Sequence, residues 1–150
     1  MSALYVIIEI GHRRAAIAAA HVQSVIELET VHPVPRAARH VAGLTALRSQ
    51  SLTVIDCRRA IGMDDTTPPA ARAPVVHHDG HSYALQVDAV HDVLEPETDP
   101  VAVPGSFGPE WQRIGSGMIE TADGPVLVID TGALIAGPAS ASAPINTRAA

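Results

Sequence analysis

The chain has 150 residues, of which 47% are apolar and 17% charged, and its ten basic residues, all arginines, face sixteen acidic ones, for a formal net charge of −6. This length predicts one domain, since domains contain roughly 100–200 residues, and the composition is typical of a folded globular protein. The acidic balance and only four aromatic residues argue against a nucleic-acid partner, because such a partner needs a basic stripe and stacking platforms.

Ten short runs rich in β-branched residues, each bounded by turn residues, predict a mostly β fold. In chain order they are residues 4–10, 15–18, 25–28, 44–47, 52–57, 74–78, 83–88, 93–95, 116–121 and 126–130. Asp79-Gly80 and Asp123-Gly124 predict two-residue hairpin turns, because such turns require positive φ. A few short helices are expected, at residues 36–41, 58–61 and 132–135.

Two stretches are expected to be unstructured. Residues 62–74, GMDDTTPPAARAP, would link two halves, and the Ala/Ser/Pro-rich residues 136–150 would form a disordered tail that folding does not need. We therefore expect one domain over residues 1–135, with subdomains at about 4–61 and 74–135. No apolar run approaches the roughly 18 residues that cross a bilayer, so we expect a soluble, cytoplasmic protein.

The two halves resemble each other. A shift of 68 positions pairs Ala16 with Ala84, Val22 with Val90, Val25 with Val93, Glu27 with Glu95, Glu29 with Glu97 and Thr30 with Thr98. A shift of 74 then pairs Gly43 with Gly117 and residues 54–56 with 128–130. Ordered matches of this kind indicate a duplication. They predict two β modules of equivalent topology about a pseudo-two-fold axis, with a groove between them and with strand exchange left open.

Residues 127–133, LVIDTGA, match the aspartic-protease signature, in which an aspartate shares a proton with its symmetry mate. The remaining chain is too short for the flap and further strand of such a protease. The mate that duplication supplies, Asp56, is followed by Cys-Arg instead of Thr-Gly. We favour the interpretation that Asp56 and Asp130 each end a strand and cap the helix that follows, with the protease as a remote alternative.

Other chemistry is weakly supported by the sequence. His78 and His81 should face each other across a turn, but His77 and His78 point to opposite faces, so at most a two-ligand metal site results and an exposed hairpin tip is favoured. The single cysteine, Cys57, excludes an internal disulfide and is interpreted as a buried small hydrophobe. We expect no catalytic residue, no metal, no cofactor and no enzyme activity.

An ordered set of segments carries a resemblance to a known family. They are VQSVI at 22–26, PVP at 33–35, VAGLTALRSQSLTVIDCR at 41–58, YALQVDAVHDVL at 83–94 and the closing segment 115–135. Over residues 4–135 the chain resembles the CheW-like domain family. The resemblance implies two SH3-like five-stranded β-barrels side by side, in agreement with the duplication.

The family also implies a function. Its members are non-catalytic adaptors that join the cytoplasmic tip of a methyl-accepting chemoreceptor to the regulatory domain of a CheA-type histidine kinase. The resemblance thus implies a cytoplasmic protein at receptor arrays on the inner face of the membrane, without membrane insertion. A CheW-like binding module in a non-chemotaxis two-component pathway is the alternative.

Site residues follow from the motif. Val22, Gly43 and Arg48 correspond to family positions associated with receptor contact, in a groove beside the barrel junction. The nearby Val25, Leu44 and Leu47 belong either to this binding surface or to the core, and the core is favoured. Arg48 either contacts a partner, which we favour, or holds its own loop by hydrogen bonds to carbonyls or to an acidic neighbour such as Asp56.

This chain departs from the family at the turn that follows the motif's arginine. Where the family usually has Asn-Leu-Arg-Gly, residues 46–49 read Ala-Leu-Arg-Ser. Glycine adopts positive φ readily, whereas a serine there costs roughly 1 kcal/mol. Either Ser49 bears that cost and the turn is kept, or the loop is remodelled and partner choice has drifted.

Overall fold

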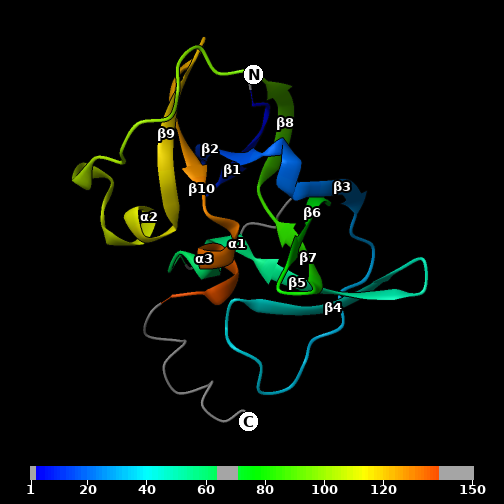
Figure 1. The fold of residues 1–150 in the computed structure, drawn as a ribbon. Helices are drawn as coiled ribbons and strands as arrows, with labels where there is room; N and C mark the ends of the chain where they lie inside the picture. Colours follow the sequence, from blue (N-terminus) through cyan, green and yellow to red (C-terminus); the bar gives the residue numbers. More distant parts are fainter. Residues whose placement is uncertain (1–2, 64–70, 139–150) are drawn as a thin grey trace.

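The computed structural model describes residues 3–63 and 71–138, which form two five-stranded sheets and a few short helices (Figure 1). The strands are β1 (Tyr5–Ile10), β2 (Arg13–Ala18), β3 (Val22–Glu27), β4 (Val41–Leu47), β5 (Gln50–Asp56), β6 (Arg72–His78), β7 (His81–Gln86), β8 (Ala89–Leu94), β9 (Gly115–Thr121) and β10 (Gly124–Ile129). The α-helices are α1 (Cys57–Ala60), α2 (Pro109–Ile114) and α3 (Thr131–Ala136), and the 3-10 helices are η1 (Ala19–His21) and η2 (Gly105–Phe107). The prediction of a mostly β fold with ten strands is confirmed.

The helices agree less well with the sequence prediction. Those expected at 58–61 and 132–135 are α1 and α3. The helix expected at 36–41 is wrong, because Arg36 has φ 65°, which ends any right-handed helix, and β4 already begins at Val41. We did not predict α2, although Gly108-Pro109 places a proline at its first turn, a common start signal.

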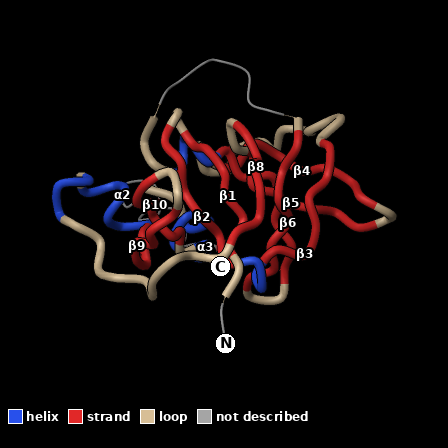
Figure 2. Tube along the Cα trace, turned by 90° about the horizontal axis from the view of Figure 1, so that it is seen from above, coloured by secondary structure: helices blue, strands red, loops and turns tan. Residues whose placement is uncertain are grey.

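The two sheets have the same topology. Their strand orders are β8-β1-β2-β10-β9, called barrel A below, and β3-β6-β7-β5-β4, called barrel B. In each, one inner pair is parallel, β2 with β10 and β5 with β7, and the other neighbours are antiparallel. Figure 2 shows the barrels side by side.

Both sheets close in the same way. The segment after β8 returns to β9, where Val101 pairs with Met118, and the segment after β3 returns to β4, where His32 pairs with Leu44. Leu44 and Met118 are 74 positions apart, the same shift that relates the two halves. The expectation of two equivalent five-stranded barrels is therefore confirmed.

The barrels do not coincide with the two halves of the chain. Barrel B is built from residues 22–86, whereas barrel A takes its strands from 5–18 and 89–129. Each barrel thus combines two strands of one repeat with three of the other, so that Val54 pairs with Ala84 and Val128 with Ala16. The strand exchange left open in the sequence analysis is therefore present, because the chain changes barrel after β2 and after β7 and not within residues 62–74.

Parts of the expected linker and tail, residues 64–70 and 139–150, lie outside the described residues. Helix α3 runs through Ala136, the first residue of the expected tail. The next residue, Gly137, has φ 85° and leaves room for the ring of His40, whose Nε2 lies 2.8 Å from the carbonyl oxygen of Ile135. The ordered fold therefore extends past residue 135.

A central apolar cluster joins the barrels. It contains Ile8 and Ile17 from barrel A and Ile55 and Leu85 from barrel B, all almost completely buried. Each barrel also has a smaller apolar cluster of its own, including Ile7 in barrel A. Burial of this area is the main favourable contribution to folding. Among the described helices, none has the length and apolar character needed to cross a membrane.

The two explicit hairpin turns are present, one of them shifted. Asp79-Gly80 forms the turn between β6 and β7, with φ of 51° and 79°, and His78 pairs with His81 across it. The β9–β10 turn lies one residue earlier than predicted, since Thr121 pairs with Gly124. Its cause is the hydroxyl of Thr121, which accepts from the Asp123 N–H and donates to the Gly124 carbonyl.

Candidate functional site

The two aspartates of the apparent protease signature are helix caps. Asp56 Oδ1 accepts from the backbone N–H groups of Arg58 and Arg59 at 3.1 and 3.2 Å, and Asp130 Oδ1 accepts from Ala133 at 3.2 Å. Each carboxylate thus satisfies donors at the start of a helix, and the capping interpretation is confirmed. Within residues 3–63 and 71–138, no three His, Cys, Asp or Glu side chains gather as a metal site requires.

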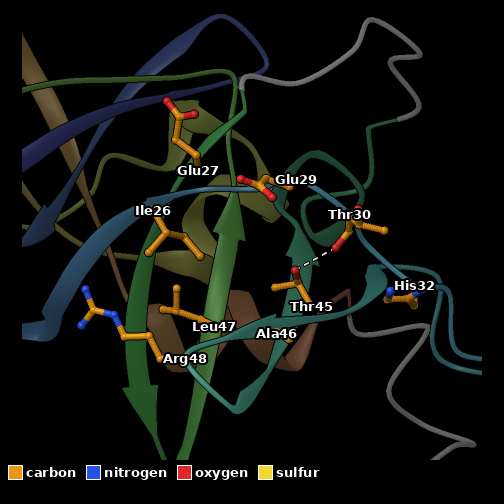
Figure 3. Close-up of a pocket in the computed structure, with 9 residues that line it drawn as sticks. All are labelled: Ile26, Glu27, Glu29, Thr30, His32, Thr45, Ala46, Leu47 and Arg48. Carbon is orange, nitrogen blue, oxygen red and sulfur yellow. Dashed lines mark hydrogen bonds between the residues drawn. The ribbon is translucent and has the colours of Figure 1, made fainter.

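A surface groove lies on barrel B, between the segment that follows β3 and the end of β4. It has a volume of about 320 Å³ and is lined by Ile26, Glu27, Glu29, Thr30, His32, Thr45, Ala46, Leu47 and Arg48 (Figure 3). Thr45 is buried, and its hydroxyl donates to the carbonyl of Thr30 at 2.8 Å, which fixes one wall of the groove to the other.

The groove combines apolar side chains with charged ones, and more of its exposed lining is polar than apolar. In Figure 3 the side chains of Ile26 and Leu47 lie between the carboxylates of Glu27 and Glu29 and the guanidinium of Arg48. Protein interfaces commonly combine apolar and charged side chains in this way. The surface therefore suits a protein segment better than a small ligand, which is normally enclosed on most sides.

Arg48 and Ser49 form the two-residue turn between β4 and β5. Both have positive φ, 52° and 71°, and the flanking Leu47 and Gln50 are paired. The turn is thus kept in the conformation that glycine adopts easily, and Ser49 bears the cost. The guanidinium of Arg48 is exposed and makes no hydrogen bond or ion pair within the described part of the chain, so the loop-holding interpretation is wrong.

The comparisons with known proteins agree with the fold. A family model described as CheW-like domain matches residues 4–139. The chain belongs to the CheW-like domain family. The structure is similar to the crystal structure of the scaffolding protein TtCheW from Thermoanaerobacter tengcongensis, with a TM-score of 0.75, 21% identity, and coverage of 86% of this chain and 84% of that chain. Among curated protein sequences, none is similar enough to count as a match.

Membership of the CheW-like family places the chain among chemotaxis coupling adaptors, which are scaffolds rather than enzymes. The motif positions of this CheW-like chain are spread over barrel B. Val22 is half-buried against the central cluster at the start of β3, and Gly43 is buried in β4. Only Leu47 and Arg48 of the six expected site residues line the groove.

The three apolar positions left open between core and surface differ from one another. Leu44 is 40% exposed, so the favoured core interpretation is wrong for it. Leu47 is half-buried, packs against the apolar cluster of barrel B and also lines the groove. Val25 is half-buried on β3.

Sequence reasoning missed Glu27, Glu29 and His32 as groove residues. The motif carries no signal for them, because they reach the groove only when the segment after β3 folds back and His32 pairs with Leu44. The repeat did single out Glu27 and Glu29, because they match Glu95 and Glu97. Glu95 and Glu97 line the corresponding depression on barrel A. That correspondence was the available signal.

Replacing Ser49 with glycine should stabilise the protein by roughly 1 kcal/mol, because glycine adopts the φ of 71° without steric cost. Urea denaturation of both proteins measures the difference. As a control, glycine at Ser51, an exposed strand position with ordinary φ, should lower stability instead. Unchanged or lower stability of the Ser49→Gly protein would contradict the turn conformation.

Cys57 should be unreactive in the native CheW-like fold. The side chain is completely buried, and burial raises the pKa of the Cys57 thiol well above 9.0, with the nearby charges of Asp56 and Asp88 adding to the rise. Only the thiolate reacts with disulfide reagents, so we expect modification only after unfolding. Because the unfolded thiol ionises near pH 9.0 and the folded one does not, the contribution of Cys57 to stability is lost as pH rises past that value. Fast modification of the folded protein would contradict its burial.

Proposed function

We propose that this protein is a non-catalytic adaptor that couples methyl-accepting chemoreceptors to a CheA-type histidine kinase in the cytoplasm, at receptor arrays on the inner face of the membrane. The observation that carries the proposal is the family match over residues 4–139, which covers both barrels. The regulatory domain of the kinase and the cytoplasmic tip of the receptor are the proposed partners.

The geometry of barrel B supports a protein partner at Arg48. The turn holds this arginine at the end of a hairpin, where its forked guanidinium can bridge a carboxylate or two backbone carbonyls of another chain. Leu44 is exposed on the same hairpin, and Ile26 and Leu47 line the adjacent groove. These residues, with Val22, Val25 and Gly43, form the proposed binding region, in which Gly43 shapes the groove wall from beneath.

The test is the affinity of the Arg48→Ala protein for the kinase regulatory domain and for the receptor tip, measured by calorimetry. We expect binding to at least one partner to weaken by about 2 kcal/mol or more, roughly 30-fold in Kd, because an exposed interface arginine is a typical hot spot. Stability should change by no more than about 0.5 kcal/mol, since the side chain has no internal partner in the described residues.

Arg14→Ala is the matched control. Arg14 is also exposed, but it lies on barrel A and pairs with Asp123 at 3.0 Å. It should leave both affinities unchanged. Normal binding by the Arg48→Ala protein would overturn the assignment of Arg48, and a wild-type protein that binds neither partner would overturn coupling in chemotaxis and favour another two-component pathway.

A further inference from the structure

We propose that Arg113, on α2, is a positioning residue that fixes the angle between the two barrels. The proposal rests on the proposed function in one respect: an adaptor with two partners needs its two barrels in a fixed relation. The contacts themselves are a property of this chain alone.

Helix α2 is the feature that breaks the symmetry between the repeats. Before it, equivalent residues such as Val25 and Val93 are 68 positions apart, and after it, Val54 and Val128 are 74 apart. The six additional residues equal the length of α2, and the corresponding connection in barrel B, between β3 and β4, contains no helix. The second repeat therefore carries a short helix that the first lacks.

Helix α2 is anchored in the central apolar cluster and to barrel A. Ile114 is completely buried in the central apolar cluster. On the outer side, the guanidinium carbon of Arg13, on β2, lies 5.1 Å from the ring centroid of Trp111 and 4.8 Å from that of Phe107. A guanidinium over the face of an aromatic ring is attracted by the ring's quadrupole. Arg13 thus ties Trp111 of α2 and Phe107 of the preceding η2 to barrel A.

From this position Arg113 reaches into barrel B. Its Nη2 donates to the carbonyl of Ala60 at 2.7 Å, at the end of α1, which follows β5 of barrel B. Its Nη1 donates to the carbonyl of Ala133 at 3.0 Å, in α3, which follows β10 of barrel A. Glu110 accepts from Nε and Nη2 at 3.2 and 3.1 Å and so orients the guanidinium.

The two helices that Arg113 joins are equivalent in the repeat and touch each other. Figure 1 shows α1 and α3 together at the centre of the molecule, and each begins at an aspartate cap with nearly the same backbone angles, φ −81° and ψ 103° at Asp56 and φ −83° and ψ 105° at Asp130. One guanidinium therefore binds both partners of a symmetric helix pair from one side.

The boundary between the two barrels needs directional contacts to keep one relative orientation. The central apolar cluster holds the barrels together, but apolar packing is non-directional and resists separation more than it resists rotation or sliding. A guanidinium presents its donors in a rigid planar fork, so two carbonyls bound to it keep a fixed relative position. Two other polar contacts cross the boundary between the barrels. Arg58 pairs with Asp88 at 3.5 Å at the connection between β7 and β8, and His40 Nε2, before β4, lies 2.8 Å from the Ile135 carbonyl oxygen in α3. Among these contacts, Arg113 is the one whose side chain binds both α1 and α3.

The test is the distance distribution between spin labels on the two barrels, measured by pulsed dipolar resonance on the protein without partners. Labels are placed at the exposed positions Ser51→Cys on β5 and Glu120→Cys on β9, with Cys57 replaced by alanine in every sample. We expect one narrow distribution with Arg113, and with Arg113→Ala a shifted distribution or one broader by about twofold. Arg113→Lys, which keeps the charge but not the fork, should give an intermediate result.

Two controls separate positioning from general loosening. Arg14→Ala removes an arginine whose ion pair lies within barrel A and should leave the distribution unchanged. A second label pair within barrel B, Gln23→Cys with Ser51→Cys, should not respond to Arg113→Ala. An unshifted narrow inter-barrel distribution in Arg113→Ala, or equal broadening within barrel B, would overturn the proposal.

Arg113→Gln keeps the test decisive if the alanine protein does not fold. Glutamine can reach one carbonyl but not two, so it should broaden the inter-barrel distribution, and a wild-type distribution would overturn the proposal. The distance measurement needs no partner, so a result that overturns the role of Arg113 would not contradict the proposed adaptor function. Conversely, normal binding by the Arg48→Ala protein would not contradict the role of Arg113.

Discussion

Replacing Gly43 with alanine is expected to destabilise the protein by about 3 kcal/mol or more, through strain and lost hydrogen bonds. Gly43 has φ 152°, and a Cβ placed on it would lie 2.2 Å from the carbonyl oxygen of His32. That carbonyl accepts from the Leu44 N–H at 2.9 Å, and the His32 N–H donates to the Leu44 carbonyl at 2.8 Å. Because backbone cannot move aside as a side chain can, the methyl group would open the closure of barrel B.

Gly117 provides the matched control, since it occupies the equivalent position in barrel A. A Cβ there would lie 3.2 Å from the Val101 carbonyl oxygen and 3.3 Å from the Pro100 side chain, and its φ is outside the positive range. Gly117→Ala should therefore cost clearly less, about 1 kcal/mol. Denaturant unfolding of both proteins measures the two effects. Equal losses would contradict the special role of Gly43.

Gly43→Ala should also weaken partner binding, but for a structural reason. The segment it displaces includes His32, which lines the groove beside Arg48. A binding loss in the Gly43 protein accompanied by lost stability therefore reports the groove wall rather than a direct contact. Arg48→Ala, with its unchanged stability, is the variant that reports contact.

Arg58→Ala should cost about 3–5 kcal/mol, the usual effect of removing one partner of a buried ion pair. The side chains of Arg58 and Asp88 are only 5% and 14% exposed, and Nε lies 3.5 Å from Asp88 Oδ1. That oxygen is buried and accepts no hydrogen bond from the described residues, although Oδ2 accepts from the His12 N–H at 3.1 Å. Without Arg58 the carboxylate would be left as an uncompensated buried charge.

Arg59 is the natural control for this prediction. It is the next residue, and its ion pair with Asp56, at 3.6 Å, involves a side chain that is 47% exposed. Arg59→Ala should cost less than about 1 kcal/mol, as exposed pairs do. Guanidinium unfolding compares the two proteins, and the double change Arg58→Ala with Asp88→Ala should recover part of the loss. A loss no larger than that of Arg59→Ala would show that the pair is not effectively buried.

The strands were predictable because their signals are local. Alternation of apolar and polar residues, β-branched runs and turn dipeptides such as Asp79-Gly80 depend on neighbours in sequence. The false helix at 36–41 arose where the local pattern was ambiguous, and the positive φ of Arg36 was decided by the return of the chain toward β4. The assignment of strands to the two barrels was not predictable, because the repeat alone does not say whether strands pair within one copy of the repeat or between the two copies.

The residues of the candidate site likewise divide into those that local sequence predicts and those that depend on long-range pairing. Arg48 was identified from a motif and its turn, which are local, and the aspartate caps were identified from their places after apolar runs. The carboxylate edge of the groove depends on a long-range pairing, His32 with Leu44, so no short pattern reveals it. Arg113 and Ala60 are 53 positions apart in the sequence, and no local sequence pattern around Arg113 predicts their contact.

In the sequence, the strands of barrel B lie between the two parts of barrel A. This arrangement sets the order in which the barrels can fold during synthesis. All strands of barrel B have been synthesised once residue 86 is made, whereas barrel A then has only its first hairpin, with the apolar side chains of β1 still lacking β8, β9 and β10. A folded barrel B holds β3 and β7 on either side of β6, so the two points at which the chain leaves toward β2 and β8 keep a fixed separation. The loop that barrel A must close is thereby shortened, which lowers its entropic cost. A folded barrel B therefore supports the folding of barrel A on the nascent chain.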